Sequence, residues 1–370
     1  MKLFKILLSL IIMNCHAQDN LNLIVGTYTN NCNNKGIYVY NFNAATAEFK
    51  LKNNTDKVIN PSYLAVSPDG KYIYSVNENG DDSTISAFTY NAATGAINFI
   101  NKKDAKGADP CYIICDEKNV IAANYSGSTI AVFERKEDGS ITAARQVIKR
   151  NGGSIDKSRQ EKPHPHMVYF SPDKKHVFAN DLGTDHVIVY SYDPDSKNDN
   201  FLKAEYALAT KPGSGPRHLA FHASGVFFYV LGELDASLTA YSYVNGKIEK
   251  VQEVSLVRDP LFTGKNGAAD IHLSNDGKFL YATNRGDANT ITVFRVHANG
   301  RLGFVQQEST CGVGPRNFTI TPNDNYILIG HQQTNDIMIF KRDKVTGMIE
   351  DTGKKIEVCS PVCLLFTESK

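Results

Sequence analysis

The side chains with the clearest chemical potential in this sequence are His166, Arg217, Glu233 and Arg285. The planar guanidinium group of arginine binds a carboxylate or phosphate through two parallel hydrogen bonds. A histidine or a glutamate can take up or release a proton near neutral pH. If the fold brings these four residues together, they would act on a small anionic molecule. We predict them as the catalytic residues.

Four further polar side chains are predicted to bind the substrate: His164, His218, Asp270 and Arg316. His164 and His166 could clamp a metal ion, but no carboxylate or third histidine stands at ligand spacing beside them, so we expect no metal. The sequence has no Gly-x-Ser-x-Gly elbow, Walker loop or dinucleotide fingerprint. We therefore expect no cofactor.

The elements that must position these residues come from one phrase that recurs along the chain. It consists of a small residue or proline, a short apolar strand, a turn, a second strand ending in aromatic-x-x-Asn, a polar loop and a third strand. A clear copy covers residues 61–88, and the phrase returns from Pro110, Pro165, Gly215, Gly267 and Gly314. The starts are about 46 to 55 residues apart, which is typical of a four-stranded propeller blade with its loops.

The two ends of the chain supply a seventh unit. Residues 22–50 read as the later strands of a unit without its first strand, and residues 360–366 read as a first strand alone. Joined, they make a blade that closes the ring. We predict an all-β, seven-bladed β-propeller that occupies residues 18–370 as one domain. A pair of β-sandwiches is the alternative, and the absence of Trp disfavours a WD40 scaffold.

In a propeller the innermost strands line a central channel, so two positions of the phrase should point into a shared pocket. The first position follows the residue that opens the first strand and holds Ser62, Cys111, His166, Arg217, Ala269, Arg316 and Val362. The second follows the end of the second strand and holds Glu78, Tyr125, Leu182, Glu233, Arg285 and Gln332, with Thr27 or Tyr28 in the split blade. If only structural repetition determined these positions, each set would hold similar residues in every unit. Polar residues in consecutive units indicate a functional site, whereas we interpret Glu78 as structural or peripheral.

The N-terminus has the features of an export signal. Lys2 and Lys5 flank the start of a short apolar run over residues 3–13, and Ala17 is a small residue at a suitable cleavage point. The run is shorter than the roughly 18 residues that a membrane span needs. We predict a signal peptide over residues 1–17 and a periplasmic or secreted protein. Lipidation at Cys15 and a cytoplasmic chain with an apolar first strand are the alternatives.

Six cysteines follow that segment: Cys32, Cys111, Cys115, Cys311, Cys359 and Cys363. No pair has Cys-x-x-Cys spacing, which argues against zinc binding and thioredoxin-like redox chemistry. The pairs 111/115 and 359/363 are four residues apart inside expected strands. We expect buried free thiols, with one disulfide in an oxidising compartment as the alternative.

Composition narrows the possible partners of this 370-residue chain. A hydrophobic content of 42% argues against disorder. Forty basic and 39 acidic side chains leave a formal net charge of +1, whereas nucleic-acid binders carry a basic excess. We expect no nucleic-acid partner and no membrane span. We also expect a monomer, because a closed propeller has no obligate edge to pair.

Two stretches are distinctive: Arg-Gln-x-x-Pro-His-x-His at residues 159–166 and Gly-Pro-Arg-His at residues 215–218. Together with residues 180–185, 232–235 and 283–287, they resemble the seven-bladed propeller lactonase family, typified by propeller-type 6-phosphogluconolactonases and related to carboxymuconate lactonising enzymes. The resemblance covers about residues 22–366. It implies a site formed by a His, two Arg and a Glu, which carry over to His166, Arg217, Glu233 and Arg285, and it implies no cofactor.

The resemblance implies a carboxylic ester hydrolase that opens a sugar-acid lactone, such as 6-phosphogluconolactone, at the channel mouth. Arg217 and Arg285 would hold the anionic group or the carbonyl oxygen. Glu233 or His166 would activate water or protonate the ring oxygen. An isomerase that forms or opens a lactone, like a muconate cycloisomerase, would use the same residues. An exported, non-catalytic propeller that binds a carbohydrate or protein is the third hypothesis. Export would separate the protein from phosphorylated gluconolactone, which is a cytoplasmic metabolite.

Overall fold

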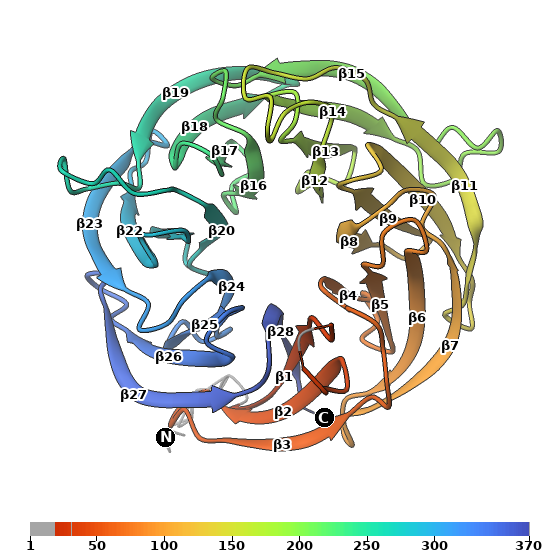
Figure 1. The fold of residues 1–370 in the computed structure, drawn as a ribbon, viewed down its shortest axis with the longest axis horizontal. Helices are drawn as coiled ribbons and strands as arrows, with labels where there is room; N and C mark the ends of the chain where they lie inside the picture. The colour runs from red at the N-terminus through yellow and green to blue at the C-terminus, as the bar shows by residue number, and fades with distance from the viewer. Residues whose placement is uncertain (1–18, 31, 370) are drawn as a thin grey trace, which may run out of the picture.

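The computed structural model describes residues 19–30 and 32–369, which form strands and turns without a helix (Figure 1). These residues make seven four-stranded sheets arranged as blades around a central axis. The predicted seven-bladed β-propeller is therefore confirmed. The described part of the chain has no helix that is long and apolar enough to cross a membrane. The predicted signal peptide lies outside the described residues.

Every blade runs from an innermost strand near the axis to an outermost strand on the rim, and neighbouring strands pair antiparallel. In order around the ring and from the inside outwards, the blades are β28 (Pro361–Glu368), β1 (Asn20–Thr27), β2 (Ile37–Asn43), β3 (Phe49–Asn54); β4 (Leu64–Val66), β5 (Tyr72–Asn77), β6 (Thr84–Asn91), β7 (Ala96–Asp104); β8 (Pro110–Cys115), β9 (Asn119–Asn124), β10 (Thr129–Arg135), β11 (Ile141–Lys149); β12 (Pro165–Phe170), β13 (His176–Asp181), β14 (His186–Tyr192), β15 (Leu202–Ala209); β16 (Pro216–Phe221), β17 (Phe227–Gly232), β18 (Ser237–Val244), β19 (Lys247–Ser255); β20 (Ala268–Leu273), β21 (Phe279–Asn284), β22 (Thr290–Val296), β23 (Leu302–Ser309); and β24 (Pro315–Ile320), β25 (Tyr326–His331), β26 (Asp336–Arg342), β27 (Ile349–Glu357).

The chain ends share one blade, as the incomplete units predicted. Strand β28 pairs with β1 from Leu21 opposite Glu368 to Thr27 opposite Pro361. A disulfide joins Cys32 to Cys359 beside this pairing, across a sequence separation of 327 residues. The expectation that all the cysteines are free was therefore wrong for these two.

The four other described cysteines are free thiols: Cys111, Cys115, Cys311 and Cys363. Cys111 and Cys363 are buried, whereas Cys311 is exposed. Cys359 lies in the turn before β28 and not inside a strand. It meets Cys32 because ring closure brings the two ends of the chain to the same blade, a contact that cysteine spacing does not encode.

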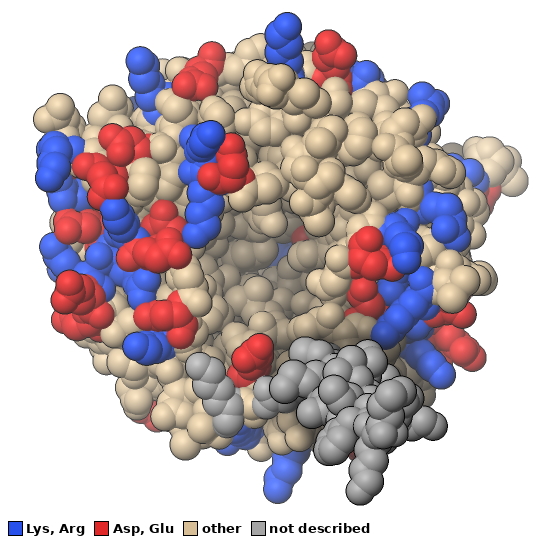
Figure 2. Space-filling view, turned by 180° about the vertical axis from the view of Figure 1, so that it is seen from behind, with Lys and Arg blue, Asp and Glu red and all other residues tan. Residues whose placement is uncertain are grey.

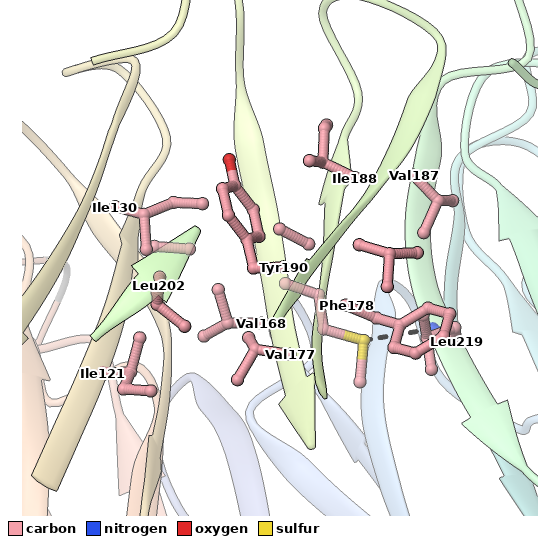
Figure 3. Packing of buried hydrophobic residues seen from close by; sticks show 14 of the residues in the cluster. Ile121, Ile130, Val168, Val177, Phe178, Val187, Ile188, Tyr190, Leu202 and Leu219 are labelled. Atoms are coloured by element: carbon pink, nitrogen blue, oxygen red, sulfur yellow. Dashed lines mark hydrogen bonds between the residues drawn. The ribbon is translucent and has the colours of Figure 1, made fainter. Parts of the chain in front are cut away.

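The core lies between neighbouring blades. Figure 3 shows one such layer, where Val177 and Phe178 of β13 pack with Val168 of β12 and Leu219 of the next blade. The middle strands are buried on both faces, so they need apolar residues in succession instead of a strict alternation. The thioether of Met167 also accepts a hydrogen bond from the Leu219 amide at 3.0 Å. This packing holds adjacent innermost strands, and the side chains at their ends, in fixed relation.

A repeated polar contact joins the outer strands of four blade pairs. The amide side chain of Gln146 accepts the N–H of Leu202 and donates to its carbonyl, both at 2.8 Å. The same two-way contact joins Asn101 to Ile141, Gln252 to Leu302 and Gln306 to Ile349. Each contact satisfies edge groups that would otherwise be free to pair with another chain.

Candidate active site

An irregularity at the start of the innermost strands turns the first set of predicted side chains towards the axis. The pairing register of these strands skips Cys111, His166, Arg217 and Arg316, each directly after the proline that begins its strand. In β20 the skip covers Ala269 and Asp270. A β-bulge leaves a residue out of the ladder and re-aims its side chain. The bulges explain how the side chains at this position turn out of the ladder, and Cys111, His166 and Arg316 line the cavity described below.

The second set of side chains follows the end of the second strand, where a backbone hydrogen bond recurs. The amide of Glu233 donates to Gly215 O at 2.8 Å, and that of Arg285 donates to Gly267 O at 3.1 Å. In the closing blade the amide of Tyr28 donates to Ser360 O at 3.1 Å. Tyr28, and not Thr27, is therefore the second-position residue of the split blade.

Both sets meet at a cavity of about 390 Å³. Its walls are formed by Glu78, Asp109, Cys111, Tyr125, Ser126, Arg159, His166, Glu233, Arg285 and Arg316. A smaller hollow of about 240 Å³ shares three of these residues, Arg159, Glu233 and Arg285. Larger hollows of about 610, 690 and 760 Å³ lie elsewhere, but the lining of each lacks this convergence of arginines around a histidine. Figure 2 shows one face of the ring, which is hollowed at its centre and carries most of its charges farther out.

Glu233 is the centre of an arginine cluster. Its Oε1 accepts a hydrogen bond from Arg159 Nη2 at 2.6 Å. Its Oε2 lies 3.0 Å from Nε of Arg217 and 3.2 Å from Nη2 of Arg285, both as ion-pair contacts. Burial raises the pKa of Glu233, but the three guanidinium groups lower it by more, to about 2. Glu233 is therefore an ionised anchor with both oxygens occupied.

A buried chain of polar contacts supports Arg217, whose residue is only 2% exposed. Its Nη1 donates to the carbonyl of Ala269 and lies 3.2 Å from Nε2 of His218. Nδ1 of His218 is 2.7 Å from Asp270, which also binds His272 at 3.0 Å. Burial and Arg217 lower the pKa of His218 to about 4, against the opposing effect of Asp270. His218 is therefore neutral at pH 7.

His166 lies in the cavity wall without a hydrogen bond to either ring nitrogen from a described residue, and its Nδ1 is buried. Its ring centroid lies 5.4 Å from those of both Tyr125 and His218. Burial, followed by the charge of Arg217, holds the pKa of His166 well below its ordinary value. The imidazole is therefore neutral and has proton-accepting capacity that no neighbour uses.

Three of the four predicted substrate-binding residues lie outside the cavity lining. His164 stacks on Tyr125 with ring centroids 4.3 Å apart, and its ring nitrogens contact Tyr125 O at 3.0 Å and Glu161 at 3.3 Å. His218 and Asp270 belong to the buried chain beside Arg217. Arg316 does line the cavity, where its guanidinium donates to Tyr28 Oη at 3.1 Å.

The described residues contain no group of three or more His, Cys, Asp or Glu side chains arranged to hold a metal ion. The site residues are instead charges and rings that contact one another directly. Four arginines, two glutamates and one aspartate, Asp109, approach the cavity region. This balance leaves a net positive site, which favours an anionic or strongly polarised ligand.

Comparison with known proteins decides the family. Residues 22–366 match the family described as "Lactonase, 7-bladed beta-propeller". The chain belongs to this family. Membership confirms the resemblance stated from the sequence and puts the chain among lactonases, which are carboxylic ester hydrolases.

Relatives of this propeller lactonase are similar over almost their whole length. A 6-phosphogluconolactonase from Formosa agariphila is 34% identical over 94% of this chain and 100% of its own. A putative 6-phosphogluconolactonase from Bacteroides fragilis is 42% identical with a TM-score of 0.90, covering 95% of this chain and 98% of that chain. The periplasmic gluconolactonase PpgL of Pseudomonas aeruginosa is 35% identical with a TM-score of 0.90, covering 95% and 100%.

Sequence reasoning missed one arginine of the cavity. Arg159 stands on neither repeated position but on the long loop between β11 and β12. Two hydrogen bonds hold that loop against the next blade. The buried side chain of Gln160 donates to Leu182 O at 2.9 Å, and Ser154 donates to Asp185 at 2.5 Å. The Arg-Gln-x-x-Pro-His-x-His stretch contained the signal, but repeat position did not identify it.

Proposed function

We propose that the protein hydrolyses the lactone of a sugar acid to the open-chain acid, with the lactone ring bound in the 390 Å³ cavity. The observation that carries the proposal is a neutral, unpartnered imidazole beside a cluster of guanidinium groups. Such a site combines a proton acceptor with fixed positive charge where an oxyanion forms. Membership of the lactonase family supports the same reaction.

Arg285 and Arg316 are the arginines that bind substrate in this proposal. Both line the cavity, and Arg285 is further held by its Nε, which donates to Gly267 O at 2.8 Å. One of them stabilises the carbonyl oxygen as negative charge develops, and the other binds an anionic or hydroxyl group of the sugar acid. Arg217 does not line the cavity, so we assign it to positioning Glu233 instead of to direct contact.

His166 is the general base in this proposal. Glu233 is a poor candidate because its oxygens are committed to three arginines and its pKa is about 2. His166 has an open acceptor, and burial of Nδ1 leaves Nε2 as the nitrogen that meets water in the cavity. Because the charges of Arg316 and Arg285 contribute to the lowered pKa of His166, an anionic substrate that neutralises them would raise that pKa and make the base stronger.

Export is the second part of the proposal. The charged and apolar pattern of residues 1–17 supports it. The Cys32–Cys359 disulfide also supports it, because disulfides persist mainly in oxidising compartments. An exported enzyme would meet sugar-acid lactones without a phosphate group, so we propose that phosphate is dispensable. N-terminal sequencing of the mature protein in periplasmic and cytoplasmic fractions tests the compartment.

The activity is tested with a panel of lactones, among them glucono-δ-lactone and its 6-phosphate, followed by acid release in weakly buffered indicator. We expect acid release above the spontaneous rate and, in ¹⁸O-labelled water, one solvent oxygen in the product. Product without solvent oxygen would favour the isomerase. No acid release from any lactone, with loss of a binding function when exposed aromatic residues are changed, would favour the non-catalytic propeller.

A further inference from the structure

A second carboxyl group, Glu78, lines the same cavity and has no role in the proposed hydrolysis so far. Oε1 of Glu78 accepts hydrogen bonds from Tyr28 Oη at 3.0 Å and from Ser62 Oγ. Tyr28 Oη also lies 3.1 Å from Oε2. Oε1 thus takes two donors, whereas Oε2 has only the shared tyrosine hydroxyl. Oε2 is therefore the oxygen with room to carry a proton.

No basic side chain forms an ion pair with Glu78 in the part of the chain that the structure describes. The guanidinium of Arg316, whose charge acts on Glu78, donates to Tyr28 Oη and lies 5.5 Å from the centre of the Tyr28 ring. The tyrosine thus stands between the arginine and the carboxyl. A partly buried carboxyl without a direct cationic partner is shifted towards its neutral, protonated form.

The electrostatic surroundings agree with this geometry. Burial is the largest influence on the pKa of Glu78 and raises it. The charge of Arg316 and the hydrogen bonds from Ser62 and Tyr28 lower this pKa, and the charge of Asp109 raises it. The net result is a raised pKa. The neighbouring Cys111 thiol has a raised pKa as well, mainly from burial, and stays neutral. Arg316 and Asp109 are the charged groups that act most strongly on Glu78. Arg159, Glu233 and Arg285 line the same cavity.

We propose that Glu78 is the general acid of the lactonase, which donates its proton to the ring oxygen of the lactone as the acyl C–O bond breaks. The inference rests on the proposed hydrolysis. A pair of ionisable groups held in opposite protonation states is the arrangement that acid and base catalysis require. His166 supplies the accepting member and Glu78 the donating member, on walls of one cavity.

The proton balance closes without a further reactant. His166 takes a proton from water while the water oxygen bonds to the acyl carbon. The C–O bond of the ring then breaks, the electron pair goes to the ring oxygen, and Glu78 supplies the proton that makes it a hydroxyl. The proton on His166 returns to Glu78 through solvent. The new carboxylic acid ionises and releases one proton to the medium.

The test compares wild-type enzyme with Glu78→Gln on two classes of lactone. Opening an aliphatic sugar lactone expels an alkoxide whose conjugate acid has a pKa of about 16, whereas opening dihydrocoumarin expels a phenoxide with a pKa of about 10. Only the first leaving group needs an acid. We expect Glu78→Gln to lower kcat about 100-fold or more on the sugar lactone and less than about 10-fold on dihydrocoumarin. The alkaline limb of the wild-type pH profile should vanish in the variant.

Asp81→Asn is the matched control, because it makes the same carboxylate-to-amide change on an exposed residue of the same loop. An equal loss on both lactones, or no loss on either, would overturn the role of Glu78. If Glu78→Gln does not fold, wild-type kcat is measured on a series of lactones whose leaving groups differ in pKa. A shallow dependence of log kcat on the leaving-group pKa supports the proposal, and a steep dependence overturns it. Absence of all hydrolysis by wild-type enzyme would instead reject the proposed function.

Discussion

Glu233 and Glu78 occupy the same position of two blades, and their surroundings could hardly differ more. Each follows the end of a second strand and donates its amide to the start of its own blade, at 2.8 Å and 3.3 Å. Glu233 is surrounded by three guanidinium groups, which hold its pKa down to about 2. Glu78 is surrounded by hydroxyl groups, and burial raises its pKa.

The difference teaches that the repeat positions the backbone, while the chemistry depends on the side chains that the same blade, other blades and a loop bring to that position. The partners of Glu233 arrive from the loop before β12 and from the blades of β16 and β20. The partners of Glu78 arrive from the split blade and its own blade. Two glutamates at one kind of site are thereby prepared as an ionic anchor and as a proton donor.

The largest effect is expected from Glu233→Gln. Loss of the charge leaves Arg217 buried without its anion, which typically costs about 3–5 kcal/mol in unfolding free energy. Displaced arginines should also reduce kcat/KM about 10³-fold. Denaturant unfolding and lactone kinetics measure both effects. In the same assays Glu78→Gln should cost no more than about 1 kcal/mol, because it keeps an oxygen that can accept from Tyr28 and Ser62. Equal destabilisation by the two changes would contradict the comparison.

His166→Asn should reduce kcat between about 10²- and 10³-fold while the melting temperature stays close to that of wild type. In wild-type enzyme the base must be neutral, and its pKa lies well below 6.5. The kcat/KM should therefore show no loss as the pH falls from about 8 past 6.5, and decrease only when it reaches that lower pKa. A half-loss of kcat/KM at pH 6.5 would show that His166 is not the base. Exposed His297→Asn is the control.

Arg159→Ala should have a smaller effect that falls mainly on KM. The Arg159 side chain is 42% exposed and contributes one of three charges to Glu233, so the other two arginines hold the carboxylate without it. We expect KM for an anionic lactone to rise about 10-fold with little change in kcat. Arg159→Lys should restore only part of the affinity, since lysine lacks the planar fork. A collapse of kcat in Arg159→Ala would mean that all three arginines are needed to orient the carboxylate.

Acid should reduce the thermal stability of the protein in two steps. The pKa of His218 is lowered to about 4 in the folded protein, whereas a histidine in the unfolded chain has a pKa of about 6.5. The unfolded chain therefore takes up a proton at a higher pH than the folded protein, and stability falls as the pH drops from about 6.5 to about 4. The pKa of Glu233 is lowered to about 2, so its contribution is present above about pH 4.5 and is lost between about 4.5 and 2. Calorimetry should find a fall of several degrees in the first interval, which His218→Asn reduces while the His166 contribution remains, and a further fall that Glu233→Gln reduces. A flat melting temperature through both intervals would refute the assignment.

Much of the fold can be predicted from the sequence, because the residues that specify each blade lie close together in the chain and recur in every unit. The phrase that begins at Pro61 recurs with one period, so blade number, strand order and the split blade can be predicted from spacing. The two channel positions follow from the same period, which is why His166, Glu233 and Arg316 could be singled out before any coordinates. The small residue or proline before the first position marks the bulge that turns these side chains inwards.

Only the tertiary structure decides which side chains contact one another around the axis. Which arginine faces which carboxyl depends on the angle between blades and on loops that cross the channel, and contacts such as Arg159 with Glu233 span 74 residues. The interpretation of Glu78 as structural or peripheral missed its place in the cavity wall. Its hydrogen-bond partner Tyr28 lies 50 residues earlier in the chain, and no residue near Glu78 in the sequence indicates this contact. The Cys32–Cys359 bond exists for the same reason. A repeated local pattern determines the ring, whereas proton affinity is set by the nearest charges in space, and ring closure alone decides which charges those are.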